Sequence, residues 1–258
     1  MRIVGKIGTS TLAHPTGLLN VRHVEELVKV LSDLKNAGNE IVLVSSGAIG
    51  MGVGKLMLPG RPADMPTKQA AAAVGQCELM YTYDKLFAEY NHTVAQVLLT
   101  GEDIHNDLRR KNMCNTINRL LELKALPIIN ENDAVATDEI GVENTIGEND
   151  TLSAIVAKLV EADLLILLSD IDGLYTADPH KDPNASLISL ITVIDDSVRA
   201  LAGGSAGDQG TGGMMTKIQA AEICMNCGCE MIITNGNNPE NLYLIMEGEP
   251  VGTTFAGN

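Results

Sequence analysis

Short apolar runs that alternate with helical segments are the feature that most constrains the fold of this chain. Residues 41–44 and 164–168 consist of Val, Ile and Leu alone, which is typical of strands buried on both faces of a parallel sheet. Residues 21–37 instead show helical periodicity and stop at Gly38, and residues 67–90 form a long alanine-rich helical segment. This alternation predicts an α/β fold, with a mostly parallel central sheet flanked by helices on both faces.

The same pattern continues along the rest of the chain. Further strands are expected over residues 3–7, 94–99, 126–129 and 231–234, with a closing edge strand over residues 252–255, and further helices over residues 105–124 and 151–161. At 258 residues the chain is long enough for one large α/β domain. We expect a single domain over residues 1–258, with a substrate-side lobe of residues 1–162 and a nucleotide-side lobe of residues 163–258.

Charge and hydropathy exclude several classes of partner. The formal net charge is −15, which argues against binding to nucleic acid or to an anionic membrane surface. No apolar run approaches the roughly 20 residues of a membrane span. The chain enters a strand pattern directly after Met1, so we expect no signal peptide and a cytoplasmic protein.

A glycine-rich loop before a helical segment predicts a phosphate site. Residues 210–217 read Gly-Thr-Gly-Gly-Met-Met-Thr-Lys. Glycine lets the backbone approach phosphate oxygens closely, and a helix N-terminus offers unpaired N–H groups and the positive end of the dipole. Lys217 adds a mobile positive charge. The alternative is a surface loop before an ordinary helix.

Polar residues follow several of the expected strands. Lys6 lies just before the Gly-Thr-Ser-Thr sequence of residues 8–11, and residues 45–50 follow the second strand with Ser, Ser and Gly. The carboxyl ends of parallel strands are where open α/β sheets bind ligands. The Asn-Glu-Asn-Asp sequence of residues 130–133 suits hydrogen bonds to a polar ligand, although an Asx-rich turn is the alternative. Residues 134–146 are expected to form a hairpin-like excursion, and Asn149 or Asp150 could cap the next helix.

Two other groups of residues favour a structural interpretation. The five cysteines lack a disulfide framework, which fits a reducing compartment. Cys224, Cys227 and Cys229 lie close together, but no partner cluster follows at the spacing of a zinc site. The basic triplet of residues 109–111 is interpreted as a solvated helix face.

Seven segments together resemble the amino acid kinase family. They are residues 6–10, 44–50, 69–76, 130–136, 148–154, 168–179 and 210–217. Each is a weak signal alone, but they occur in the order of the family and span almost the whole chain. The resemblance implies the sandwich-like α/β fold of that family, with substrate and nucleotide on adjoining lobes.

The resemblance also implies an activity and its participants. Members with these segments use ATP and Mg²⁺ to phosphorylate the γ-carboxylate of L-glutamate, which is the first step of proline synthesis. Carried over by position, Lys6 and Lys217 contact the transferred phosphoryl group, and Asp150 holds the two lysines in place. The residues implied at the substrate are Ser46, Gly47, Asp133 and Asn149. Those implied at the nucleotide are Lys6, Ser169, Asp170, Gly210, Thr211, Gly212, Gly213, Met214 and Lys217.

The chain departs from the family pattern in two places. The usual Phe-Gly-Asp-Asn-Asp sequence reads Ile-Gly-Glu-Asn-Asp over residues 146–150, which affects the expected detail of the substrate loop. Many members carry a C-terminal PUA domain, and this chain stops at Asn258 without one. We expect a homo-oligomer, a dimer or a tetramer, formed through the kinase domain.

Two alternatives stay open from the sequence. A sibling kinase would act on aspartate, N-acetylglutamate, carbamate or a nucleoside monophosphate. A non-catalytic sensor would bind ATP or an amino acid, but such a protein would have no need for both Lys6 and Lys217. No histidine is expected to serve as a general base, because a carboxylate with a pKa near ~4.3 is already ionised at neutral pH.

Overall fold

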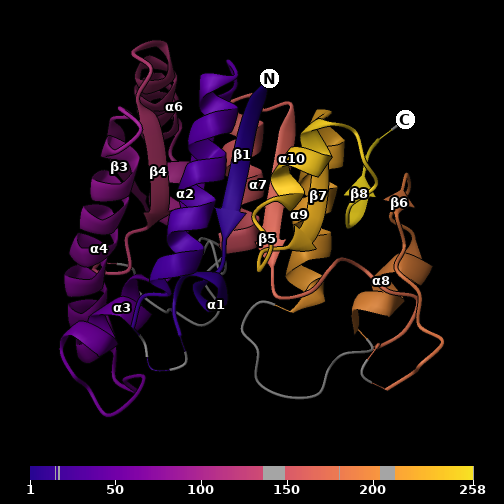
Figure 1. Ribbon diagram of the computed structural model, residues 1–258, viewed down its shortest axis with the longest axis horizontal. Helices are drawn as coiled ribbons and strands as arrows, with labels where there is room; N and C mark the ends of the chain where they lie inside the picture. The colour runs from indigo at the N-terminus through magenta and orange to yellow at the C-terminus, as the bar shows by residue number, and fades with distance from the viewer. Residues whose placement is uncertain (15, 17, 136–148, 180, 204–212, 258) are drawn as a thin grey trace.

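The computed structural model describes the whole chain except residues 15, 17, 136–148, 180, 204–212 and 258. Over the described residues, eight strands form one sheet in the order β3-β4-β2-β1-β5-β7-β8-β6 (Figure 1). The strands are β1 (Arg2–Ile7), β2 (Glu40–Ser45), β3 (Val94–Leu99), β4 (Leu126–Glu131), β5 (Leu164–Ser169), β6 (Leu190–Ile191), β7 (Glu230–Asn235) and β8 (Thr253–Phe255). The pairings are parallel except for the antiparallel pair β7–β8, so the predicted α/β class and mostly parallel sheet are confirmed.

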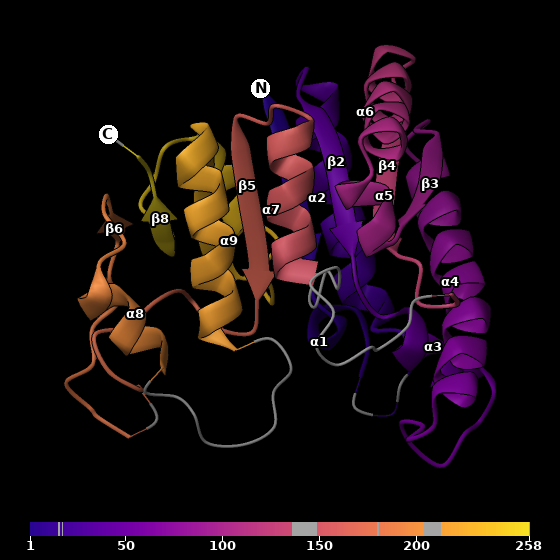
Figure 2. The ribbon, with the colours of Figure 1, turned by 180° about the vertical axis from the view of Figure 1, so that it is seen from behind.

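Helices cover both faces of this sheet. The helices are α1 (Thr9–Leu12), α2 (Val21–Asn36), α3 (Ala48–Lys55), α4 (Met65–Ala88), α5 (Gly101–His105), α6 (Asp107–Glu122), α7 (Asn149–Leu159), α8 (Asp196–Gly203), α9 (Met214–Cys227) and α10 (Asn241–Met246). Figure 1 shows α2 and α10 in front of the sheet, and Figure 2, from behind, shows α7 and α9 in front of it. None of the described helices is long and apolar enough to cross a membrane.

The alternation of side chains along each strand divides the core between the two faces. Val4, Val42 and Val44 belong to a core cluster with residues of α6, α7 and α9. Ile3 and Ile41 belong to a second cluster with residues of α2, α4 and α10. Both faces of the central strands are therefore buried, which is why their sequences read as continuous apolar runs.

The two parts of the chain lie on opposite sides of the sheet centre. Strands β1 to β4 form one side, strands β5 to β8 form the other, and β1 pairs with β5 where the two sides meet. The sheet is continuous across this point. The lobe boundary between residues 162 and 163 stays a prediction, and it coincides with the connection from α7 to β5.

One expectation for a single element is wrong. Residues 252–255 were expected to close the sheet at its edge, but β8 lies between β7 and β6. Strand β6 has only two residues, which is too short to produce an alternating pattern. The helix expected over residues 105–124 is present as α6 (Asp107–Glu122), and the short α5 before it was not predicted. Asn106 separates the two helices, because it is extended and its side chain accepts hydrogen bonds from the N–H groups of Leu108 and Arg109.

Helices α3 and α4 pack unusually closely at a glycine. A Cβ atom at Gly75 of α4 would lie 1.7 Å from the carbonyl oxygen of Ala48 in α3. Only a residue without a side chain fits there. This contact brings the beginning of α3, which follows the carboxyl end of β2, against the middle of α4.

Candidate active site

Lys6 is directed to one face of the sheet by the strand alternation. It lies two residues after Val4 in β1, so both side chains point to the face that α7 and α9 cover. The pairing of β1 with β5 places Lys6 opposite Leu167, near the carboxyl ends of both strands. Parallel strands of this kind end at one edge, where ligands bind.

Asp150 and Lys217 come from the first turns of α7 and α9, which lie side by side in Figure 2. Both side chains are buried, with relative exposures of 2% for Asp150 and 8% for Lys217. The helix that follows the glycine-rich loop begins at Met214, so Lys217 lies inside its first turn and not before it.

The three charged side chains meet in one cluster. Lys6 Nζ lies 2.7 Å from Asp150 Oδ1, and Lys217 Nζ lies 3.1 Å from Asp150 Oδ2. Thr216 also donates a hydrogen bond from Oγ1 to Asp150 Oδ2, at 3.1 Å. The structure therefore brings together an early lysine, a late lysine and a carboxylate between them.

The electrostatics of this cluster favour an anion. Burial by itself raises the pKa of Asp150, but the ammonium groups of Lys6 and Lys217 hold that pKa below its ordinary value. Asp150 is therefore ionised at neutral pH and balances one of the two positive charges. The N-termini of α7 and α9 add the positive ends of two helix dipoles.

A second cluster, made of neutral side chains, begins at the next residue. Asn149 donates from Nδ2 to Ser46 Oγ at 2.6 Å and to Asn130 Oδ1 at 3.3 Å. Asn130 in turn donates from Nδ2 to Gln76 Oε1 at 2.9 Å. This neutral relay connects α7, the loop after β2, the end of β4 and the middle of α4.

Ser46 and Gly47 are held by the turn between β2 and α3. The N–H of Ser46 donates to the carbonyl of Ile7 at 3.0 Å, which ties this loop to the end of β1. Gly47 has a φ of +100° at the N-cap of α3, a conformation that favours glycine. The Ser-Ser-Gly sequence thus folds into a sharp strand-to-helix turn that presents Ser46 to Asn149.

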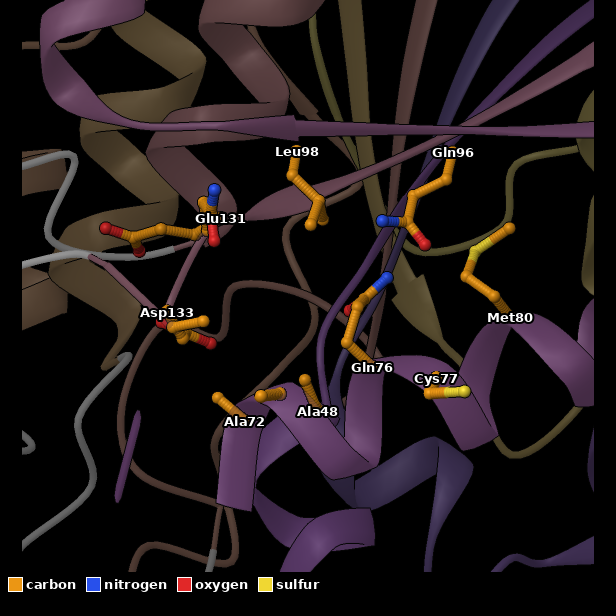
Figure 3. A pocket seen from close by; sticks show the side chains of 12 residues that line it. Ala48, Ala72, Gln76, Cys77, Met80, Gln96, Leu98, Glu131 and Asp133 are labelled. Atoms are coloured by element: carbon orange, nitrogen blue, oxygen red, sulfur yellow. The ribbon is translucent and has the colours of Figure 1, made fainter. Parts of the chain in front are cut away.

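A pocket of about 320 Å³ adjoins the neutral relay (Figure 3). Gln76 and Asp133 line it, together with Ala48, Ala72, Ala73, Cys77, Met80, Gln96, Leu98, Glu131, Asn132 and Ala134. Asp133 lies in the turn after β4. The structure therefore places Asp133 in a pocket wall, as a ligand-binding interpretation of the residue 130–133 segment requires.

Ser169 and Asp170 lie at the carboxyl end of β5, next to β1 in the sheet. Ser169 Oγ donates to Asp170 Oδ1 at 3.1 Å. Among the predicted nucleotide residues, Gly213 is the N-cap of α9 and Met214 is its first residue. Gly210, Thr211 and Gly212 lie outside the described residues, as does most of the expected hairpin-like excursion.

Sequence reasoning missed Thr216 and Gln76, and it singled out Asn130 only as part of the Asn/Asp-rich segment of residues 130–133. All three lie within segments that carried the family resemblance, but nothing in their spacing marked them individually. The contact between Asn130 and Gln76 joins residues 54 positions apart, and a single sequence does not reveal such a pairing.

The basic triplet of residues 109–111 lies on a solvated helix face, as predicted, and the three neighbouring cysteines lie at and just after the end of α9. No cluster of three or more His, Cys, Asp or Glu side chains that could hold a metal exists among the described residues. Cys224 is buried near the end of α9, and its carbonyl accepts the N–H of Cys229 at 3.0 Å in the turn that ends this helix at Gly228. Arg109 pairs with Asp103 and Arg110 with Asp107 on a largely exposed surface.

Comparison with solved structures identifies the class of fold. The carbamate kinase from Giardia lamblia bound to AMP-PNP aligns with a TM-score of 0.67 and 18% sequence identity, over 100% of this chain and 98% of that one. The T. acidophilum isopentenyl phosphate kinase product complex aligns with a TM-score of 0.63 and 18% identity, over 98% of this chain and 99% of that one. The fold is that of these small-molecule kinases.

Sequence comparison then identifies the family. The sequence profile of the amino acid kinase family matches residues 1–235. The chain is 54% identical to the glutamate 5-kinase of Listeria innocua over 255 residues, which cover 99% of this chain and 92% of that protein. It is also 54% identical to the glutamate 5-kinase of Clostridium tetani, over 98% of this chain and 93% of that one. The chain belongs to the amino acid kinase family.

Proposed function

We propose that this protein transfers the γ-phosphoryl group of ATP to the γ-carboxylate of L-glutamate, forming L-glutamyl 5-phosphate, the first product of proline biosynthesis. The observation that carries the proposal is the meeting of Lys6 and Lys217 on Asp150 at the carboxyl edge of the sheet. Identity of 54% to glutamate 5-kinases over nearly the full chain supports the choice of substrate.

The chemistry asks for charge neutralisation more than for proton transfer. A glutamate carboxylate, with a reference pKa near ~4.3, is already the nucleophile at neutral pH. Its approach to an anionic phosphate is opposed by repulsion, and the transition state spreads negative charge over three equatorial oxygens. Two ammonium groups, that of Lys217 buried and that of Lys6 partly exposed, are fixed before the substrates arrive and would stabilise that charge without reorganisation.

In this mechanism Asp150 is a positioning residue for both lysines. Its two carboxylate oxygens contact different ammonium groups, so Lys6 and Lys217 are held at a fixed separation. The positive charge of the pair exceeds that of the carboxylate by one, and this excess attracts the phosphate. Lys6 and Lys217 would contact the phosphoryl group directly.

The neutral relay supplies the substrate side of the proposed site. Ser46, Gly47 and Asn149 lie at the loop and helix end that meet beside Asp150, and Asp133 lines the neighbouring pocket. The nucleotide would lie along the ends of β1 and β5, at Ser169, Asp170, Gly213 and Met214. The backbone N–H groups at the start of α9 suit phosphate oxygens.

Magnesium would bind at this site as a complex with the phosphates of ATP. No cage of three or more acidic, histidine or cysteine side chains exists among the described residues, and Mg²⁺ is commonly held by substrate phosphates, waters and few carboxylates. Asp150 and Asp170 are the candidates for such a carboxylate. The bound ion would supply additional charge neutralisation. The expected homo-oligomer stays a prediction.

ADP release measured with a panel of acids tests the proposed function. The panel contains L-glutamate, aspartate, N-acetylglutamate and carbamate, each with ATP and Mg²⁺, and hydroxylamine is added to trap an acyl phosphate. We expect ADP release that depends on L-glutamate, with one hydroxamate formed for each ADP. Turnover of another acid in preference to L-glutamate would show that this other acid is the substrate. Binding of ATP or an amino acid without any turnover would favour a non-catalytic sensor.

A further inference from the structure

The neutral relay leaves two buried polar atoms without a partner. Among the described residues, Gln76 Nε2 and Asn149 Oδ1 are buried and have no hydrogen-bond partner. Gln76 is 8% exposed. A buried amide nitrogen without an acceptor is destabilising, so a ligand that supplies the acceptor would be favoured at this position.

One backbone group fixes which way each amide of the relay points. The N–H of Glu131 donates to Asn130 Oδ1 at 2.9 Å, and a backbone N–H can only donate. Asn130 must therefore present its nitrogen to Gln76, which requires Oε1 of Gln76 on that side. The nitrogen of Gln76 is then the atom that stays unpartnered, and the relay cannot use it.

That nitrogen is directed into the pocket. Figure 3 shows Gln76 rising from α4 with its side-chain nitrogen on the side of Gln96, while Asp133 lies at the opposite side of the pocket. The described lining residues include the acidic side chains of Glu131 and Asp133 and no lysine, arginine or histidine. A carboxylate in this pocket would therefore depend on neutral donors.

We propose that Gln76 is a substrate-binding residue that donates its Nε2–H to the α-carboxylate of the amino-acid substrate, while its Oε1 positions Asn130 and, through it, Asn149. This inference rests on the proposed function and adds the recognition of the other end of the substrate. The γ-carboxylate belongs at the charged cluster, so the pocket receives the end that carries the ammonium group and the α-carboxylate. Asp133 suits the ammonium group, and Gln76 suits the carboxylate.

Gln76→Glu is the variant that separates the two functions of this side chain. A glutamate keeps an oxygen that accepts the hydrogen bond from Asn130, so the relay is preserved. It replaces the donor with a negatively charged oxygen, which repels the α-carboxylate. The test compares L-glutamate with L-isoglutamine, in which the α-carboxylate is an amide that can donate to the new carboxylate.

We expect Gln76→Glu to lower kcat/KM for L-glutamate roughly tenfold or more, mainly through KM, because a hydrogen bond to a charged group is lost. The KM for ATP should stay within about twofold, since the phosphate groups lie at the other cluster. The affinity for L-isoglutamine, measured as a substrate or as a competitive inhibitor against L-glutamate, should fall much less or rise. Equal losses for the two compounds, or no loss, would overturn the assignment.

Gln96→Glu is the matched control, because it places the same charge in the same pocket on β3. An equal decrease of kcat/KM for L-glutamate in Gln96→Glu would show that the effect is general charge repulsion, and it would overturn the role of Gln76. If thermal melting shows that Gln76→Glu is unfolded, Gln76→Met decides: it adds no charge and removes both the donor and the acceptor for Asn130, so the test is the difference between the two compounds and not the loss itself. Gln76→Met should still lower the affinity for L-glutamate more than the affinity for L-isoglutamine, and equal decreases would reject the proposal.

The two proposals fail in different ways. Absence of L-glutamate turnover in the unaltered protein would overturn the proposed function. Normal turnover in the unaltered protein, with an unselective effect of Gln76→Glu, would overturn only the role of Gln76.

Discussion

The charged cluster and the neutral relay are adjacent in the structure but are held together by different interactions. The first joins Lys6, Asp150 and Lys217 by ion pairs, whereas the second joins amide and hydroxyl groups by hydrogen bonds. Asn149 and Asp150 are adjacent at the start of α7, and each belongs to one of the two. A single helix end therefore connects the region suited to phosphate with the region suited to the amino acid.

This difference in chemistry suits two separate functions of the proposed site, phosphoryl transfer and recognition of the amino acid. In the proposed mechanism, charge is concentrated where one anion attacks another, and the lysines are mostly shielded from solvent, so their field is only weakly screened by water. Apart from Asp133, recognition of the amino acid would instead rely on directed neutral groups, which discriminate by geometry. Substitutions in the charged cluster should therefore affect turnover and stability, and those in the neutral relay should affect KM.

The largest expected effect is on stability, in the charged cluster. Asp150→Asn removes the carboxylate between Lys6 and Lys217 and leaves two positive charges close together, of which that of Lys217 is buried. The free energy of unfolding should fall by about 3–5 kcal/mol, the usual result of breaking a buried pair. Urea unfolding measures this. A change in the free energy of unfolding below about 1 kcal/mol would show that the ion pairs contribute little to the fold.

The same variant carries a pH dependence. The pKa of Asp150 is lowered in the folded protein, so its contribution is present above the unfolded-state pKa of about 3.9 and is lost as the pH falls through the lower folded value. The stability difference between the unaltered protein and Asp150→Asn should be constant from pH 5 to 8 and should shrink only below about pH 4. A difference that already disappears between pH 7 and 6 contradicts the lowered pKa.

The next effect is on turnover. Lys217→Ala should lower kcat by roughly a hundredfold or more, by analogy with the loss of one preorganised donor in other active sites. Asp150 keeps its contact with Lys6, so the fold should persist. Lys158→Ala, which removes an exposed lysine from α7, is the control and should have normal kcat. A near-normal rate for Lys217→Ala would remove this lysine from the mechanism.

A smaller effect is expected where α3 meets α4 behind the neutral relay. Gly75→Ala places a Cβ 1.7 Å from the carbonyl oxygen of Ala48, so the helices must separate. We expect a loss of about 1–3 kcal/mol of stability from this overpacking and a raised KM for L-glutamate, because Gln76 moves with α4. Ala70→Ser, at an exposed position of the same helix outside the pocket lining, provides a control. Unchanged stability of Gly75→Ala would mean that the helix contact is looser than the structure shows.

The smallest effect concerns the pocket. Asp133→Ala should raise the KM for L-glutamate by about tenfold or more, the loss of a hydrogen bond between charged groups, with little change in the KM for ATP. Steady-state kinetics with each substrate varied in turn separates the two. Equal changes in both values would argue that Asp133 supports the fold of the site and does not bind the amino acid.

The sequence was informative for the sheet and for the charged residues. Strands such as residues 164–168 were predicted because burial on both faces produces an unbroken apolar run. The sequence singled out Lys217 by its glycine-rich loop and Lys6 by its place at a strand end, but their shared role with Asp150 came from the family resemblance, because Lys6 and Lys217 are over 200 positions apart and no spacing rule connects them. Their meeting on Asp150 needed coordinates.

Other features left too little trace in the sequence. Strand β6 has two residues and helix α5 has five, so neither is long enough to show a clear periodicity in the sequence. The relay through Gln76 depends on the contact of α4 with β4, and on amide orientations that one backbone N–H sets. Such pairings depend on tertiary contacts, and local patterns do not encode them.

The most direct test of the account is a crystal structure with a non-hydrolysable ATP analogue, Mg²⁺ and L-glutamate. The account predicts that the γ-phosphoryl group lies within hydrogen-bond distance of Nζ of both Lys6 and Lys217, with the γ-carboxylate approaching it beside Asn149. A triphosphate whose γ-phosphoryl group lies away from both lysines would contradict it.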